Sequence, residues 1–174
     1  MYQDANGNVI PGLSTRGYRA VAIPGTVAGL ELARTRYGSR PRAALMAAAI
    51  RLARDGFVLD HGDAQFLNEG AADFAKDAPS ARIFMKNGRP WQKGDTFVQA
   101  DLSRMLQAIS TKGAPAFYTG EIARRIVAAS RAHGGVMTLA DFAAYRAVER
   151  KPVECDYRGY HIVSAPLPSS GGVV

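Results

Sequence analysis

Histidine and cysteine, the side chains best suited to acid–base and metal chemistry near neutral pH, are few and widely separated in this chain of 174 residues. The histidines are His61, His133 and His161, and no two have the i, i+4 spacing that presents a pair of imidazoles on one helix face. His133 falls at the predicted end of a helix, where a cation interacts favourably with the helix dipole. No cluster of His, Cys, Asp and Glu has the spacing of metal ligands. We therefore expect structural or surface histidines, no metal site and no cofactor.

The single cysteine is a poor candidate for a nucleophile. Cys155 stands between Glu154 and Asp156, and neighbouring carboxylates oppose formation of the reactive thiolate. With one cysteine, no internal disulfide can form. Paired catalytic carboxylates cannot be selected either, because the acidic residues of the middle region are distributed like ordinary helix-surface charge. These acidic residues are Asp55, Asp60, Asp63, Asp73 and Asp77.

The sharpest local motif is Ser169-Ser170-Gly171-Gly172. Two hydroxyls and two flexible glycines before an apolar run suit a strand-to-helix turn whose amides face a ligand. They also suit an ordinary helix N-cap, which is the interpretation that local chemistry favours. The motif is neither a Gly-x-Ser-x-Gly elbow nor a phosphate-binding loop, which needs a lysine. Because a finished domain rarely ends on an apolar stretch, Val173-Val174 lead us to expect more chain beyond them.

The composition is that of an ordinary globular protein, with 47% hydrophobic and 21% charged residues. We predict a single incomplete domain over residues 1–174, in which residues 1–20 are loop-like because turn-forming residues are frequent there. The net charge of +7 suits an anionic partner, but the basic residues are dispersed, so we expect no nucleic-acid binding. The chain lacks the run of about 18 apolar residues that a membrane span needs. The polar residues 1–7 do not have the pattern of a signal peptide.

The expected elements are mostly helices, with strands towards the C-terminus, so the predicted fold class is helix-rich α+β. Ser39 is expected to cap the second helix, and Thr138, with Asp141 three residues later, to cap a short one. The face of the second helix expected to be buried is Leu45, Ala48, Ala49, Leu52 and Ala53. Helices are expected over residues 26–37, 40–55, 60–75, 101–112 and 121–133, and strands over 82–85, 148–157 and 160–164.

Several motifs in a fixed order resemble one protein family. They are Pro24-Gly25-Thr26-Val27-Ala28-Gly29-Leu30, Arg36-Tyr37-Gly38, Ile50-Arg51-Leu52-Ala53-Arg54-Asp55-Gly56-Phe57, Phe117-Tyr118-Thr119-Gly120-Glu121-Ile122-Ala123, Gly134-Gly135 with Thr138 and Asp141, Tyr157-Arg158-Gly159-Tyr160, and Pro168-Ser169-Ser170-Gly171-Gly172. Each motif is weak alone, but their order and spacing resemble the large subunit of γ-glutamyltranspeptidases, or glutathione hydrolases, from about residue 20 onward. One departure is Leu167, where the family usually has a third proline, and this is a mild change within a turn.

The resemblance implies an N-terminal-nucleophile hydrolase with a four-layer αββα fold, of which this chain would be a large-subunit piece. Such enzymes are made as a precursor, or zymogen, that cleaves itself before a threonine. The freed threonine attacks a γ-glutamyl amide such as glutathione with its own α-amine as base, and backbone amides stabilise the oxyanion. The γ-glutamyl group then passes to water, an amino acid or a peptide. Family habit also implies a periplasmic or secreted location.

None of the catalytic residues implied by the resemblance falls within this chain. The nucleophilic threonine would begin the small subunit, beyond Val174, and the arginine that binds the substrate carboxylate would precede Met1. Internal threonines have no free α-amine and cannot take the role; they are Thr15, Thr26, Thr35, Thr96, Thr111, Thr119 and Thr138. We therefore expect no catalytic residue here, and a scaffold whose partners are the missing N-terminal part and the small subunit.

Two other functions are compatible with the sequence. One is a cephalosporin acylase-type amidase on the same scaffold, and the other is a non-catalytic helical interaction module. A glutamate-binding arginine outside this chain would favour the transpeptidase over the acylase. An open reading frame that continues past Val174 to an internal threonine would exclude the module.

Overall fold

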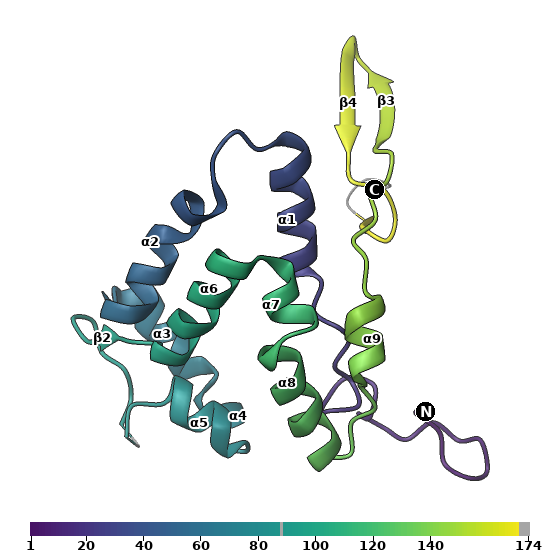
Figure 1. Cartoon of the computed structure of the whole chain (residues 1–174). Coiled ribbons are helices and arrows are strands. Elements are labelled where there is room, and N and C mark those ends of the chain that lie inside the picture. The colour runs from purple at the N-terminus through teal and green to yellow at the C-terminus, as the bar shows by residue number, and fades with distance from the viewer. Residues whose placement is uncertain (88, 171–174) are drawn as a thin grey trace.

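The computed structural model describes residues 1–87 and 89–170, which fold mainly into helices (Figure 1). The helices are α1 (Thr26–Tyr37), α2 (Arg42–Asp55), α3 (His61–Glu69), α4 (Ala71–Phe74), α5 (Ala78–Phe84), α6 (Ala100–Lys112), α7 (Ala114–Tyr118), α8 (Glu121–Ala132) and α9 (Leu139–Ala144). The strands are β1 (Phe57–Val58), β2 (Thr96–Phe97), β3 (Val153–Tyr157) and β4 (Tyr160–Ser164). The predicted helix-rich α+β class is confirmed.

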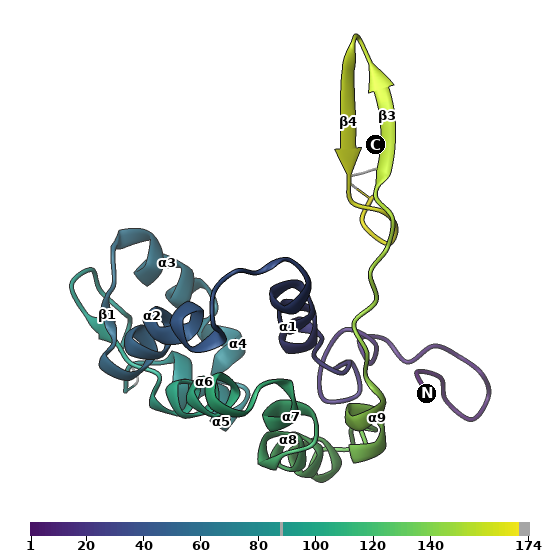
Figure 2. The ribbon, with the colours of Figure 1, turned by 45° about the horizontal axis from the view of Figure 1, so that its top comes forward.

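The helices and the C-terminal strands occupy different parts of the molecule. Figures 1 and 2 show α2 to α8 gathered into one body, whereas the hairpin of β3 and β4 projects away from the helices. The two strands pair antiparallel, with Tyr157 opposite Tyr160. Positive φ angles at Arg158 and Gly159 close the turn between them. Hairpins favour such angles because they match the twist of the strands.

The main core lies where α6, α7, α8 and α9 meet. Phe142 of α9 is fully buried, and its ring centroid lies 6.2 Å from that of Phe117 and 6.4 Å from that of Tyr118. The helices predicted over residues 101–112 and 121–133 therefore both face a packed core. Its buried members are Ile109, Phe117, Tyr118, Ala123, Val127, Met137 and Phe142.

A second, smaller cluster of aromatic rings holds the region of β1 and β2 together. Phe97 of β2 is buried, and its ring packs edge-on against Phe57 at 6.0 Å and Trp91 at 5.3 Å between centroids. The side-chain amide of Asn68 makes two hydrogen bonds with the backbone of Trp91, 2.9 and 2.8 Å long. The indole of Trp91 donates to the carbonyl of Phe84 at 2.8 Å. These two-residue strands are absent from the predicted elements, because so short a run carries almost no periodic pattern.

One capping prediction is confirmed and another is wrong. The N–H of Asp141 donates to the hydroxyl of Thr138 at 3.2 Å, and the carboxylate of Asp141 accepts from the N–H of Thr138 at 2.8 Å, which completes the capping box of α9. Ser39 does not cap α2, whose N-cap position is Pro41. The residue before a proline disfavours helical angles, so Arg40 stays outside the helix and Ser39 is left too far from its first turn.

The predicted strand over residues 82–85 is wrong, because these residues form the end of α5 and its C-cap. The carboxylate of Asp77 accepts a hydrogen bond from the N–H of Ser80 at 2.9 Å. This helix start outweighs the strand preference of the three apolar residues Ile83, Phe84 and Met85. The helix predicted over residues 60–75 is divided at Gly70 into α3 and α4, because glycine in a helix interior weakens it.

Proline and glycine account for two further differences. Helix α7 is absent from the predicted elements; it starts directly after Gly113, whose φ of 75° separates it from α6, and Pro115 stands in its first turn. Proline is favoured in the first turn of a helix. The strand expected over residues 148–157 begins only at Val153, because Pro152 lacks the N–H that a strand ladder needs.

The face of α2 that we expected to be buried is largely exposed. Leu45 is 52% and Leu52 48% exposed, while Ala53 is buried. Helix α2 packs on α6 along adjacent positions instead, where Ile50 is half-buried and its carbonyl accepts from the hydroxyl of Ser103 at 3.3 Å. The alanine-rich pattern correctly indicates an apolar face, but nothing in the described part of the chain covers it.

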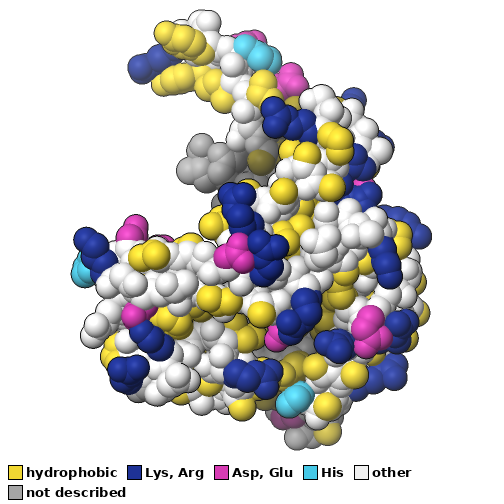
Figure 3. All heavy atoms as spheres, turned by 60° about the vertical axis from the view of Figure 1, so that its left-hand side comes forward, with side chains coloured by type: hydrophobic (Ala, Val, Ile, Leu, Met, Phe, Trp, Pro, Cys, Tyr) yellow, Lys and Arg dark blue, Asp and Glu magenta, His cyan; other side chains and the backbone are white. Residues whose placement is uncertain are grey.

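The chain exposes more surface than a self-contained protein of its mass. Its accessible surface is 12486 Å², whereas a folded monomer of 18.6 kDa exposes about 8,200 Å². Figure 3 shows hydrophobic side chains spread between lysines and arginines over one face. Large apolar side chains that are more than half exposed include Leu30, Tyr37, Leu45, Phe66, Tyr160 and Val163. The elements thus present surfaces that domains ordinarily bury.

Candidate functional site

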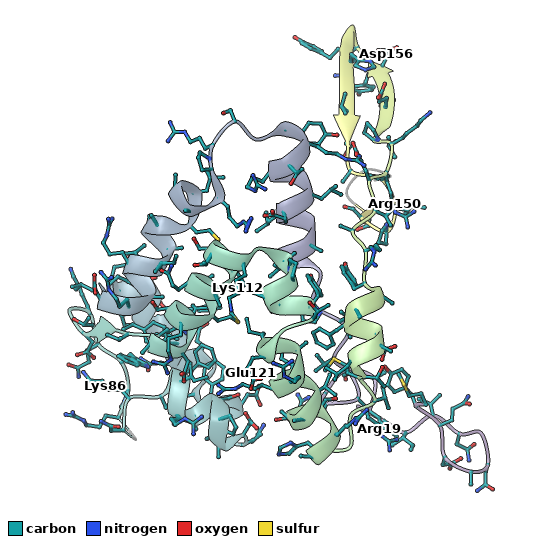
Figure 4. All side chains as sticks on the ribbon, in the orientation of Figure 1. Arg19, Lys86, Lys112, Glu121, Arg150 and Asp156 are labelled. Carbon is teal, nitrogen blue, oxygen red and sulfur yellow. The ribbon has the colours of Figure 1, made fainter. Side chains whose placement is uncertain are left out.

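The histidines do not come together. The ring of His133 stacks on that of Tyr18, with centroids 4.4 Å apart. His161 lies on the hairpin, with Nδ1 3.0 Å from the carboxylate of Asp156, which Figure 4 places near the outer end of the hairpin. His61 begins α3 and borders an open hollow. These contacts fit structural or surface roles, and within residues 1–87 and 89–170 no three potential metal ligands gather at one point.

The other candidate nucleophiles also have structural surroundings. Cys155 is exposed on β3. The N–H of Ser169 donates to the carbonyl of Pro166 at 3.1 Å, while Gly171 and Gly172 lie outside the described residues. Several threonine hydroxyls donate to the carbonyl three or four residues earlier, and they belong to Thr15, Thr35, Thr111 and Thr119. These hydroxyls therefore bind the backbone of their own helix or turn.

One polar network joins motifs that are far apart in the sequence. The hydroxyl of Tyr118 donates to the carbonyl of Pro24 at 2.7 Å and accepts from the N–H of Ala28 at 3.1 Å. The ring of Tyr145 stacks on Tyr118 with centroids 5.6 Å apart and 4° between the planes. Its hydroxyl lies so close over Gly25 that a Cβ there would be 2.2 Å away. Burial raises the pKa of Tyr118, so the phenol stays neutral and ties the start of α1 to α7 and α9.

The other end of α1 is tied to the segment that leads into the hairpin. Arg36 and Tyr37, in the last turn of α1, both bind the carboxylate of Glu149. Figure 4 places the next residue, Arg150, at the base of the hairpin. Helix α1 is therefore fixed at both ends by residues from α7, α9 and the chain that follows α9.

An apolar groove of about 770 Å³ lies between α1 on one side and α2 with α6 on the other. The carboxylate of Glu31 lies 2.8 Å from Nη2 of Arg34 and 3.3 Å from Nε of Arg42, so this ion-pair network connects α1 to the first turn of α2. The apolar lining includes Val27, Leu30, Leu45, Met46, Met105 and Leu106. We call this hollow the α1–α2–α6 groove.

The chemistry of the α1–α2–α6 groove suits binding rather than catalysis. The hydrogen bond from Arg34, reinforced by the charge of Arg42, lowers the pKa of Glu31, so the carboxylate is ionised at neutral pH. Two guanidinium groups against one carboxylate leave the groove with an excess of positive charge. The residues that line it include no histidine, cysteine or serine. The one carboxylate of the lining, Glu31, is held by two guanidinium groups, which makes it a poor proton acceptor.

Several residues of these networks lie outside the motifs found in the sequence, among them Tyr145 and Glu149. Tyr145 ends α9, and Glu149 meets Arg36 from 113 residues away along the chain. No local pattern reveals such partners, because the contacts depend on how the helices pack.

Comparison with known proteins shows which family the chain resembles. A model of the gamma-glutamyltranspeptidase family matches residues 1–174. The glutathione hydrolase proenzyme of Pseudomonas sp. (strain A14) is 55% identical over 175 residues, covering 100% of this chain and 30% of that protein. The acylase ACY 1 proenzyme of Pseudomonas sp. (strain SE83) is 38% identical, over 90% of this chain and 28% of its own length. The solved gamma-glutamyltranspeptidase of Helicobacter pylori matches 99% of this chain and 50% of its own chain, with a TM-score of 0.93 and 43% identity.

These matches place the fold among the N-terminal-nucleophile hydrolases. The chain belongs to the gamma-glutamyltranspeptidase family, which confirms the resemblance read from the ordered motifs. It spans about 30% of the length of the curated relatives it matches. In the described part of the chain, no helix combines the length and the apolar character needed to cross a membrane.

Proposed function

We propose that the whole protein, of which this chain is a large-subunit piece, is a γ-glutamyltransferase and glutathione hydrolase. It cleaves γ-glutamyl amides such as glutathione and transfers the γ-glutamyl group to water, amino acids or peptides. The observation that carries the proposal is the 55% identity to a glutathione hydrolase proenzyme along 100% of this chain. The word proenzyme, shared by a second relative from Escherichia coli, supports an autocatalytic processing step.

Within that enzyme, the chain is a scaffold. The nucleophilic threonine and the glutamate-binding arginine belong to the small subunit and to the preceding part of the large subunit, which are its partners. The groups found here build a rigid frame, in which Tyr118 holds one end of α1 and Glu149 the other. Such rigidity supports catalysis indirectly, because a catalytic site needs its residues held in position.

The cephalosporin acylase-type amidase is the second candidate. Its specific support is the acylase ACY 1 proenzyme, but this relative is 38% identical, against 55% for the glutathione hydrolase proenzyme. The two candidates share a fold and differ in the acyl group accepted, so the substrate decides between them. The non-catalytic helical module receives no support from relatives of this kind.

Cleavage of γ-glutamyl-p-nitroanilide tests the proposal. The complete gene product and the 174-residue chain are assayed side by side, with a cephalosporin amide as second substrate. We expect activity on the γ-glutamyl substrate in the complete, self-cleaved product only. A self-cleaved product that accepts the cephalosporin amide and rejects the γ-glutamyl substrate would establish the acylase. Activity of the 174-residue chain alone would refute the scaffold assignment.

We also propose that the enzyme is periplasmic or secreted. The support is the habit of the family, in which γ-glutamyl transfer takes place outside the cytoplasm. Fractionation of cells that express the complete open reading frame tests this proposal. Activity in the periplasmic fraction or the medium is expected, whereas activity confined to the cytoplasm would exclude it.

A further inference from the structure

The α1–α2–α6 groove is apolar and open along its rim. Leu30 on α1 is 68% exposed, and Leu45 on α2 is 52% exposed. Both side chains line the groove from opposite sides. Burial of a leucine side chain stabilises a protein by removing apolar area from water, so a groove with both leucines exposed favours a cover.

The large exposed surface of the chain supports the view that other polypeptide packs on the groove. The accessible surface of 12486 Å² is about one and a half times that of a self-contained monomer. The Helicobacter pylori chain matches this fold with a TM-score of 0.93, and this chain accounts for only 50% of its length. In that relative, the same arrangement of helices thus exists beside an equal length of further polypeptide.

We propose that the α1–α2–α6 groove receives an apolar segment from the remaining half of the large subunit, in the same polypeptide. The inference depends on one part of the proposed function, namely that the whole protein contains a large subunit as long as that of its relatives. A covalently linked segment is favoured over a second copy of the chain, because linkage keeps its effective concentration near the millimolar range.

The charges in the groove add a requirement on the segment. Arg34 and Arg42 lie against the single carboxylate of Glu31, and both guanidinium groups are about one quarter exposed, at 26% and 24%. A buried excess of positive charge is unfavourable unless it is paired. The segment therefore places a carboxylate, or the carbonyl groups of a helix C-terminus, against these two arginines, with apolar side chains between Leu30 and Leu45.

Thiol accessibility tests this proposal. In a Cys155→Ser background, which removes the exposed native thiol, Leu30→Cys is labelled with a maleimide in the complete gene product, once in the native state and once unfolded in urea. Modification at position 30 is followed by mass spectrometry of the peptide. We expect labelling at least about tenfold slower in the native state, because access would require a local opening of the packed segment.

Arg125→Cys is the matched control, because this side chain is 80% exposed on the charged surface of α8. It should label at similar rates in the native and the unfolded complete product. Equal labelling of Leu30→Cys in the two states would overturn the proposal, since the groove would then be open to solvent in the complete protein.

Photo-crosslinking identifies the segment. A benzoylphenylalanine at Leu45 in the complete product should form crosslinks to the large subunit outside this chain. Crosslinks to the small subunit, or to a second copy at rates that depend on concentration, would overturn the proposal. The γ-glutamyl assay of the same preparation is independent. A product that is inactive but protects Leu30→Cys would refute only the proposed function. A product that is active but leaves the groove open would refute only the inference about the groove.

Discussion

Gly25 and Gly29 are one helical turn apart, and they differ in how much space surrounds them. At Gly25, a Cβ would lie 2.2 Å from the hydroxyl of Tyr145 and 3.0 Å from its Cζ atom, and the ring cannot move away without leaving its stack on Tyr118. At Gly29, inside α1, a Cβ would meet nothing within 4 Å. The first glycine is therefore required by packing, while the second only weakens its helix.

Alanine at these positions should consequently have opposite effects. Gly25→Ala should lower the free energy of unfolding by about 1–3 kcal/mol, the usual cost of overpacking. Gly29→Ala should raise it by about 0.5–1 kcal/mol, because alanine is the better helix former. Urea titration of the complete gene product, followed by intrinsic fluorescence, measures both. If Gly25→Ala were tolerated as well as Gly29→Ala, the contact with Tyr145 would not be as rigid as described.

Glu31 makes the connection of α1 to α2 dependent on pH. Its pKa is lowered in the folded state, first by the hydrogen bond from Arg34 and then by the charge of Arg42. A carboxyl whose folded pKa is lowered contributes stability that is present above its ordinary pKa of 4.5 and is lost as the pH falls through the folded value. The stability of wild-type protein should therefore fall with acid partly through this group.

Glu31→Gln removes that contribution. The variant should be less stable than wild type at neutral pH, and the difference should shrink as the pH falls below 4.5, the ordinary pKa of the group. Urea titrations at a series of pH values measure it. Glu69→Gln is the control, since the carboxylate of Glu69 accepts a hydrogen bond from the uncharged side chain of Gln65 at 2.9 Å, which a glutamine can also accept. A constant difference for Glu31→Gln across the series would contradict the assignment.

At the scale of elements, α9 is a short helix that closes the main core. Its six residues would not form a stable helix alone. It is held by the capping box of Thr138 and Asp141 at its start and by Phe142, which is packed against α7. A single ring therefore fixes the position of an element on which Tyr145 and the route to the hairpin depend.

Phe142→Ala should destabilise the protein by about 3–5 kcal/mol, the usual cost of removing a buried phenylalanine. Phe142→Leu serves as the matched control, because an apolar side chain of similar volume keeps most of the packing and should cost less than about 1.5 kcal/mol. Differential scanning calorimetry of both variants of the complete gene product measures the two effects. Equal losses for Phe142→Ala and Phe142→Leu would contradict a role for the volume of this ring in the core.

At the scale of the whole molecule, this chain exposes more accessible surface than a folded monomer of its mass. We expect the isolated 174 residues to aggregate or oligomerise, because the exposed face of α2 and the hairpin β3–β4 offer apolar area and free strand edges. Size-exclusion chromatography with light scattering measures this. A monodisperse monomer with a sharp thermal transition would contradict the expectation, and the complete gene product, analysed in parallel, is expected to remain soluble.

Local chemistry could be predicted from the sequence better than long-range packing. The capping box at Thr138 and the bounds of α1 follow from residues close to each other in the chain. The strand expected over residues 82–85 is wrong, because Asp77 starts a helix whose capping bond outweighs the three apolar residues that follow Arg82. The face of α2 that packs on α6 could not be predicted, since it depends on contacts with a helix 53 residues away in the sequence. The partners of Tyr118 could not either, as they are 90 and 94 residues away.

The attachment of α1 at both ends has a consequence for synthesis on the ribosome. Pro24 precedes Tyr118 by 94 residues, and Arg36 precedes Glu149 by 113. At about 5–20 residues per second, α1 is translated roughly 5–20 s before the tyrosine that holds its first turn. During that interval the nascent helix has no core to pack on, so a chaperone that binds apolar stretches has several seconds in which to act on it.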